Sequence, residues 1–179
     1  MRINDSDIAA ELTRNPEKGF RLLMARYKEP VYWHIRRIVV SHYDAQDAAQ
    51  ETFVRIFRSF DDLRNKDSLT AWIYRIATNE AIRQLKQRIP EAASLENCTA
   101  DVMSLCADEY VDYDNVEAVK LQRAIQLLPP RQKVAFTLRY YDELSYTEIA
   151  EIMETTAANA KMSYHIAKNK IIDFMNSND

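Results

Sequence analysis

The chain has 179 residues, enough for one domain or two small ones, and 47% of them are hydrophobic, which suffices for packed cores. No stretch approaches the roughly 18 to 20 apolar residues that a membrane span needs, and the N-terminus lacks the basic-then-apolar order of a signal peptide, so we expect a cytoplasmic protein. A single glycine, Gly19, leaves little material for tight hairpin turns and favours an all-α fold.

Charge is distributed unevenly along the chain. The net charge of -3 argues at first against a nucleic-acid partner, because such proteins usually show a basic field. However, residues 20–88 carry 13 Lys+Arg against 8 Asp+Glu, whereas residues 89–119 carry 8 acids and no Lys or Arg. A basic unit is therefore followed by an acidic strip, and the whole-chain value hides both.

Helical periodicity begins near the N-terminus. A short amphipathic segment covers residues 5–13, and apolar residues recur at helical spacing over residues 16–27 and again over 31–40. Pro30 separates the last two segments and removes a backbone donor. We expect either two helices or one kinked helix there.

The next helix is expected over residues 44–60. Asp44 is a plausible N-cap, and Phe53 and Phe57 are assigned to the buried side together with several small residues. Asp47, Gln50 and other polar residues are then left on the outer face.

A charged connector over residues 61–68 leads to a long helix expected from about Leu69 to Arg88. Trp72 belongs to its apolar stripe, so a core role is favoured for it over base stacking. The opposite stripe has steps of four, four and three, which places its members on one face: Arg75, Asn79, Arg83 and Lys86.

Residues 91–114 show little periodicity and many acids, which is typical of a tether. A plain disordered linker and a functional acidic strand remain equally open. Cys98 and Cys106 lie eight apart without a second pair or a nearby histidine, so we interpret them as reduced thiols and expect no metal site.

The last part of the chain has the pattern of a helix-turn-helix. A helix is expected from Val116 to about Leu128, a second one starts at Pro130, and Ser145 with Glu148 forms a capping box for a short third helix. A longer helix over residues 157–174 has no acid between Thr155 and Ile172. Such a helix can lie in a major groove, although a charged outer face is more often only solvated.

Two blocks of residues resemble a known family. Residues 128–132 (LPPRQ), 138–141 (LRYY), 144–152 (LSYTEIAEI) and 164–168 (YHIAK) resemble region four of bacterial sigma factors of the extracytoplasmic-function (ECF) group. Residues 44–57 (DAQDAAQETFVRIF) and 71–79 (AWIYRIATN) are similar to their region two. Both blocks occur in the family's order.

The resemblance implies two small helical domains, residues 1–89 and 115–179, joined by an acidic linker over residues 90–114. It implies a sigma factor that binds core RNA polymerase and directs initiation at promoter DNA, without catalysis, cofactor or small-molecule substrate. An anti-sigma factor, membrane-bound or soluble, is a plausible further partner. In the family the linker passes through the polymerase near the template, where acids could imitate nucleic acid. Alternatively, they keep the two units apart or mask basic surfaces in the free protein.

The resemblance also assigns candidate contacts. The polymerase-binding candidates are Asp44, Asp47, Gln50, Glu51 and Arg55. The candidates for reading and melting the minus-ten element are Arg64, Lys66, Arg75, Asn79, Arg83 and Lys86. The candidates for the minus-thirty-five element are Arg131, Asn159, Lys161, Met162, His165 and Lys168.

Two positions depart from the family pattern. Glu154 stands where a glycine is common in the turn, which puts the docking angle in doubt, and Arg83 stands where an aspartate is common.

Three rival functions compete with this interpretation of the sequence. An enzyme lacks any recognisable motif, an operator-binding helix-turn-helix regulator leaves residues 44–57 unexplained, and a sequestering module would bind no DNA.

Overall fold

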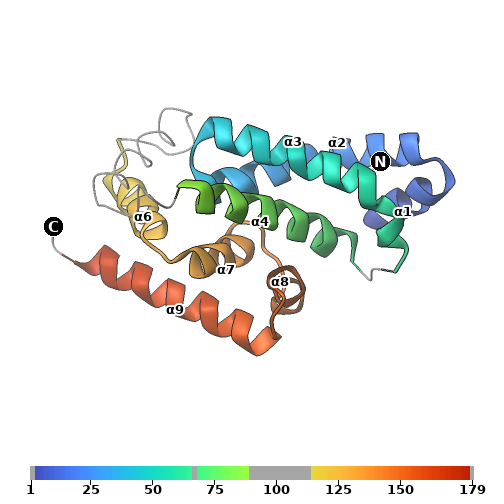
Figure 1. The fold of residues 1–179 in the computed structure, drawn as a ribbon. Helices are drawn as coiled ribbons and strands as arrows, with labels where there is room; N and C mark the ends of the chain where they lie inside the picture. The colour runs from blue at the N-terminus through green and yellow to red at the C-terminus, as the bar shows by residue number, and fades with distance from the viewer. Residues whose placement is uncertain (1–2, 66–67, 89–113, 178–179) are drawn as a thin grey trace.

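The structure, a computed structural model, describes residues 3–65, 68–88 and 114–177. Its regular elements within those ranges are all helical, which confirms the expected all-α fold (Figure 1). The first unit contains α1 (Asp5–Arg14), α2 (Pro16–Val39), α3 (His42–Ser59), the 3-10 helix η1 (Phe60–Asn65) and α4 (Leu69–Arg88). The second unit contains α6 (Val116–Gln126), α7 (Pro130–Tyr140), α8 (Tyr146–Met153) and α9 (Ala157–Asn176). The expected linker, with Cys98 and Cys106, lies outside the described residues apart from Asp114.

Helix α2 runs without a break through Pro30. The proline cannot donate a backbone hydrogen bond, but it lies on the exposed side of the helix, where water can satisfy the carbonyl left without a donor. On the opposite side, Val31, Ile35 and Ile38 are fully buried. Their packing keeps the second half of α2 against the core, so one helix forms in place of two.

Helix α3 begins two residues earlier than expected. Its N-cap is Ser41, whose side-chain oxygen accepts a hydrogen bond from the amide of Asp44 at 3.4 Å. Asp44 as the N-cap was therefore wrong: it lies in the first turn, where its charge is favourable to the helix dipole. The tight reversal before α3 uses Val40, a buried β-branched residue whose positive φ of 67° is a strained backbone conformation.

The core of the first unit is built from facing stripes of α2, α3 and α4. Trp72 is buried at 8% exposure, as expected. Phe57 is 53% exposed, so its assignment to the core was wrong. Phe53 and Ile56 already fill the inward face of α3, and Phe57 lies one step around the helix, with its ring edge-on to Phe20 at 5.2 Å between centroids.

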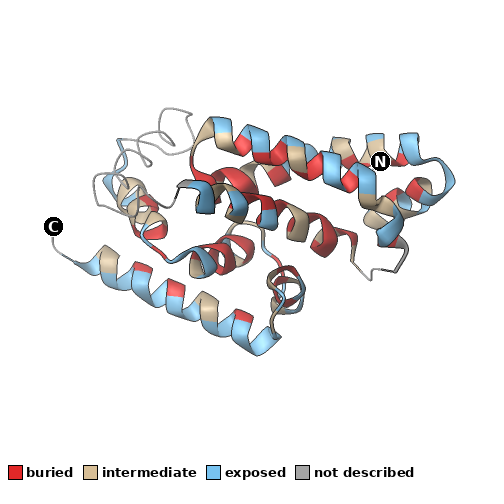
Figure 2. Ribbon diagram, in the orientation of Figure 1, coloured by how far each residue is buried: buried red, intermediate tan, exposed pale blue. Residues whose placement is uncertain are grey.

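Both units contribute to one continuous apolar core. Helix α8 packs against α4, and α7 packs against α2. Consequently Leu138, Ile149 and Ile152 belong to the same buried cluster as Ile73 and Ala77 of α4. Figure 2 shows the buried residues gathered on the surfaces where the helices face one another. A smaller cluster around Phe136 and Ile171 joins α6, α7 and α9.

None of the helices in the described part of the chain is long and apolar enough to cross a membrane.

Gly19 sets the distance between α1 and α2. A Cβ placed there would lie 2.4 Å from the backbone nitrogen of Leu12, closer than any real contact. We expect Gly19→Ala to lower the free energy of unfolding by about 1–3 kcal/mol, because α1 would have to move, even though alanine is the better helix former. Urea denaturation measures this, and an unchanged or higher stability would disprove the close approach.

Candidate nucleic-acid and protein interfaces

One face of α3 is exposed to solvent. Tyr43, Asp47, Gln50, Val54 and Phe57 follow one another at steps of four and three, and all five are exposed. We call these five residues the docking face. Asp47 and Gln50 were predicted as contacts. The three apolar members were missed, although their spacing was visible in the sequence, because an aromatic residue in a helix is usually assigned to the core.

The other predicted residues of α3 lie beside this face. Asp44 is half-buried in the first turn, and Glu51 receives a hydrogen bond from Nε of Arg55 at 3.1 Å. Nε of Arg55 also lies 2.8 Å from a carboxylate oxygen of Glu80 on α4. Glu80 is only 2% exposed, and its other oxygen lies 2.7 Å from the guanidinium of Arg83.

Glu80 therefore joins two predicted contact surfaces through one buried charge. A carboxylate out of water is costly unless cations and donors surround it, and Arg55 and Arg83 supply both. Both arginine side chains remain about half exposed, so their outer edges stay accessible. Sequence reasoning missed Glu80, because nothing in the local pattern shows that a charged residue of α4 is buried against α3.

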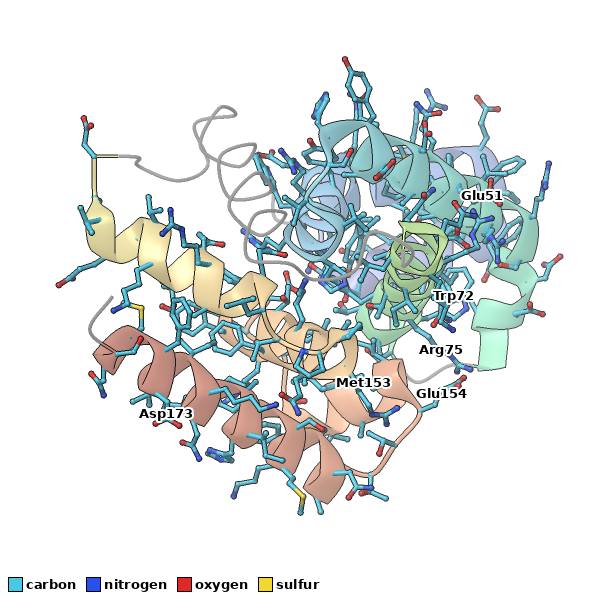
Figure 3. All side chains as sticks on the ribbon, turned by 60° about the vertical axis from the view of Figure 1, so that its left-hand side comes forward. Glu51, Trp72, Arg75, Met153, Glu154 and Asp173 are labelled. Atoms are coloured by element: carbon cyan, nitrogen blue, oxygen red, sulfur yellow. The ribbon has the colours of Figure 1, made fainter. Side chains whose placement is uncertain are left out.

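The predicted cationic stripe of α4 is largely accessible. Asn79, Arg83 and Lys86 are exposed, whereas Arg75 is half-buried and forms an ion pair with Glu154 at the end of α8. Figure 3 shows Arg75 and Glu154 next to each other across the boundary between the units. Lys66 lies outside the described residues, and Arg64 lies in η1.

The helix-turn-helix has sharply defined ends. The hydroxyl of Ser145 accepts from the amide of Glu148 at 3.2 Å, and the carboxylate of Glu148 accepts from the amide of Ser145 at 2.8 Å. The predicted capping box is therefore confirmed. Thr156 caps α9 in the same way, through a hydrogen bond from the amide of Asn159 at 3.1 Å.

The turn between α8 and α9 is closed by Glu154 in the left-handed conformation, with φ of 53° and ψ of 51°. This backbone region favours glycine, and for other residues it costs roughly 1–2 kcal/mol. The turn thus keeps the left-handed backbone conformation that a glycine would adopt, although a glutamate stands at this position. What glutamate adds at this position is a carboxylate for Arg75.

Helix α9 is anchored on one side only. Ala160, Ala167 and Ile171 are buried, while Met162 is 60% exposed. All the predicted contact residues for the duplex element are exposed: Arg131 on α7, and Asn159, Lys161, Met162, His165 and Lys168 on α9. Since residues 156–171 contain no acid, this surface can approach phosphates without like-charge repulsion.

Two family models match the chain in series. Sigma-70 region 2 matches residues 23–89, and Sigma-70 region 4 matches residues 118–171. Among characterised relatives, the ECF RNA polymerase sigma factor SigW of Bacillus subtilis is 28% identical over 165 residues, covering 87% of this chain and 88% of its own. The ECF RNA polymerase sigma-E factor of Escherichia coli K12 is 29% identical over 180 residues, covering 95% and 93%.

Solved structures with the same fold include two complexes. CnrH bound to the cytosolic domain of CnrY superposes with a TM-score of 0.72 at 16% identity, covering 96% of this chain and 97% of that one. The sigma factor RpoE of Bartonella quintana, bound to the anti-sigma factor NepR, gives a TM-score of 0.68 at 19% identity and covers 90% and 99%.

The capping box gives a direct test of the helix-turn-helix. Ser145→Ala should lower the free energy of unfolding by about 1 kcal/mol, because the Glu148 amide loses its acceptor. Thr147→Ala, two residues further along the same helix, is the matched control and should cost little, since Thr147 is exposed and alanine favours helix. Thermal unfolding of both variants measures the difference. Equal melting temperatures would contradict the role of the cap.

Proposed function

This chain is a sigma factor of the ECF group, a subunit that binds core RNA polymerase and directs promoter-specific initiation, and we propose that it divides this work between three exposed surfaces. The observation that carries the proposal is the order of the two sigma regions along one chain, each with an accessible face of suitable chemistry. We assign residues 1–89 to polymerase docking and the minus-ten element, residues 90–114 to the linker, and residues 115–179 to the minus-thirty-five element.

The docking face is the proposed binding site for core RNA polymerase. Exposed aromatic and aliphatic groups next to polar ones are the usual anchors of a protein interface, and here Tyr43, Val54 and Phe57 surround Asp47 and Gln50. The predicted contacts Asp44, Glu51 and Arg55 would form its rim.

Helix α4 with η1 is the proposed surface for the minus-ten element. An opened strand needs cations for its phosphates and polar groups for an extruded base, and no covalent step. Asn79, Arg83 and Lys86 are accessible for this in the present structure. Arg64, Lys66 and Arg75 complete the proposed set.

Helix α9 is the proposed recognition helix for the minus-thirty-five element. It would lie in the major groove of the intact duplex. Asn159, Met162 and His165 present groups for base edges, while Lys161 and Lys168 replace phosphate counterions. Arg131 would hold a phosphate from α7.

We propose that the chain acts in the cytoplasm, where polymerase and DNA are found, and that it has no catalytic activity of its own. An operator-binding regulator is not favoured, because it leaves the region 2 match over residues 23–89 without a role. The two solved relatives are complexes with CnrY and with the anti-sigma factor NepR, which supports an anti-sigma partner for this chain too.

The docking face can be tested by two substitutions. Asp47→Lys and Phe57→Ala should each raise the Kd for core RNA polymerase by about thirtyfold or more, the effect of losing an interface anchor worth about 2 kcal/mol. Asp173→Lys, the same charge reversal on an exposed residue of α9, should leave that Kd unchanged. Binding is measured with purified core enzyme in the absence of DNA. Wild-type affinity in both test variants would reject the docking assignment.

The duplex-reading surface is tested through its dependence on salt. If Lys161 contacts one phosphate, Lys161→Ala should reduce the salt slope of promoter binding by about one unit, with little change in sequence preference. Lys28→Ala, an exposed lysine of α2, serves as the matched control. Holoenzyme binding at promoters that require the minus-thirty-five element gives the slope, and identical slopes for both variants would remove Lys161 from the interface.

A further inference from the structure

Helix α9 has a second apolar strip on the side that faces solvent. Its inward side is made of small and aliphatic side chains that are buried against the rest of the unit. On the exposed side, Ala158, Met162 and Ile166 follow one another at steps of four, and Met162 and Ile166 are 60% and 40% exposed. We call these three residues the outer strip. We propose that the outer strip recognises the C5-methyl groups of thymines in the minus-thirty-five element.

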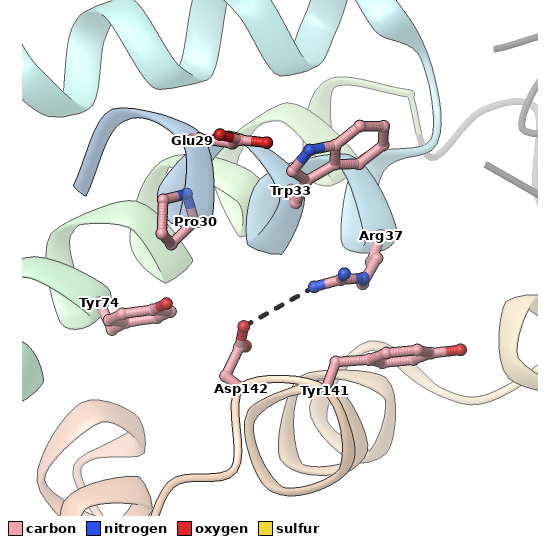
Figure 4. A pocket seen from close by; sticks show the side chains of 7 residues that line it. All are labelled: Glu29, Pro30, Trp33, Arg37, Tyr74, Tyr141 and Asp142. Atoms are coloured by element: carbon pink, nitrogen blue, oxygen red, sulfur yellow. Dashed lines mark ion pairs between the residues drawn. The ribbon is translucent and has the colours of Figure 1, made fainter. Parts of the chain in front are cut away.

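The outer strip is accessible in the folded chain. Helix α9 packs on α6, α7 and α8, and it lies along the outer edge of the second unit (Figure 1). The main contacts with the first unit come from α7, α8 and the loop between them, where Asp142 reaches His34 Nδ1 at 2.7 Å and Arg37 at 3.8 Å. Figure 4 shows Asp142 pointing toward Arg37. The outer strip is therefore open to a partner that approaches from solvent.

The charges around the outer strip favour a nucleic acid as that partner. Residues 156–171 contain three lysines and no acid, and Lys161 and Lys168 are exposed beside the strip. Lysines suit phosphates, whereas the centres of protein interfaces are depleted of them. A helix-turn-helix places the N-terminal residues of its second helix at base edges, and the strip starts at the second residue of α9, Ala158.

Thymine is the base that an apolar side chain can recognise. In the major groove all base pairs present donors and acceptors, and thymine adds a C5-methyl group. An apolar side chain placed over a G·C pair would displace water from its polar groups without replacing the hydrogen bonds, which costs free energy. Met162 suits a methyl contact because its unbranched thioether side chain adapts to the groups around it. The chemistry of the strip thus selects A·T pairs.

The spacing of the strip sets how far apart these thymines lie. An α-helix rises about 1.5 Å per residue, so Ala158 and Met162 are about 6 Å apart along α9. Successive base pairs are about 3.4 Å apart, so the two side chains reach methyl groups about two base-pair steps apart. Ile166 lies one turn further from the helix N-terminus, away from the residues that contact base edges. The base contacts therefore fall to Ala158 and Met162, and Met162 supplies the larger apolar surface.

The test removes one methyl group at a time. The full chain with core RNA polymerase first selects its preferred promoters from a library randomised over both elements. Each selected thymine of the minus-thirty-five element is then replaced singly by deoxyuridine, which lacks only the C5-methyl group. Wild-type holoenzyme should bind about fourfold more weakly when the thymine facing Met162 is replaced, the effect of one lost methyl contact.

Two variants separate recognition from stability. Met162→Ala should bind thymine and deoxyuridine equally at that position, because alanine is too short to reach the methyl group. Ile172→Ala removes an exposed apolar group further along α9 and, as the matched control, should keep the fourfold difference. A purely structural role of Met162 would weaken binding to both DNAs by the same factor and leave their ratio unchanged.

Three results would overturn the inference: a selected element without thymine, a wild-type holoenzyme that binds deoxyuridine as tightly as thymine at every position, or a Met162→Ala holoenzyme that keeps the full methyl preference. The third is the result expected if the strip binds a protein. The inference rests on the proposed function, and the two failures are distinguishable. If wild-type chain and core polymerase initiate from no member of the library, the function is rejected and the inference with it. Initiation without a methyl preference rejects the inference alone.

Discussion

The burial of one carboxylate, Asp142, decides how the halves of this molecule lie relative to each other. Apolar faces of α7 and α8 could rest on the first unit in several registers, since hydrophobic contact is non-directional. A buried charge that pairs with His34 and Arg37 favours the register in which the three side chains meet. The shared core, the position of α8 on α4 and the pairing of Arg75 with Glu154 belong to that same register.

A second buried carboxylate has the same role inside the first unit. Glu80 ties α4 to α3 by holding Arg55 and Arg83, so the proposed polymerase and minus-ten surfaces are linked through one buried carboxylate. Rigid support of this kind favours a melting surface, because an extruded base is bound best by groups already in place. In the second unit, α9 is held by the buried side chains of Ala160, Ala167 and Ile171, and its exposed residues form the proposed duplex-reading surface.

Local chemistry in the sequence was enough for much of the fold. The bounds of α4 follow from its apolar period and the start of α8 from the Ser145 capping box, because both signals lie within a few residues of the element they define. The N-cap of α3 was misplaced because Ser41 and Asp44 are equally good caps, and the choice depends on the reversal at Val40.

Long-range pairing was not visible in the sequence. His34 and Asp142 are 108 positions apart, and nothing in either neighbourhood indicates that a histidine and an aspartate will be buried together. Phe57 was misassigned for a related reason. Whether an aromatic residue faces inward depends on how much of the inner face its neighbours already occupy, which is a property of the packed helices. The sequence identified candidate contact residues. It did not show that a residue of one unit, such as Arg75, pairs with a residue of the other.

With a single glycine in its sequence, the chain uses a glutamate, Glu154, for the left-handed position in the turn after α8. The side chain that ends α8 in a left-handed conformation is also the one that reaches Arg75. Replacing it by glycine would relax the corner and, in the same step, remove a tie between the halves. A single substitution in the turn before α9 would thus stabilise the helix-turn-helix and weaken its contact with α4. Variation at this corner therefore changes the stability of the turn and the contact with α4 together, and leaves the exposed residues of α9 as they are.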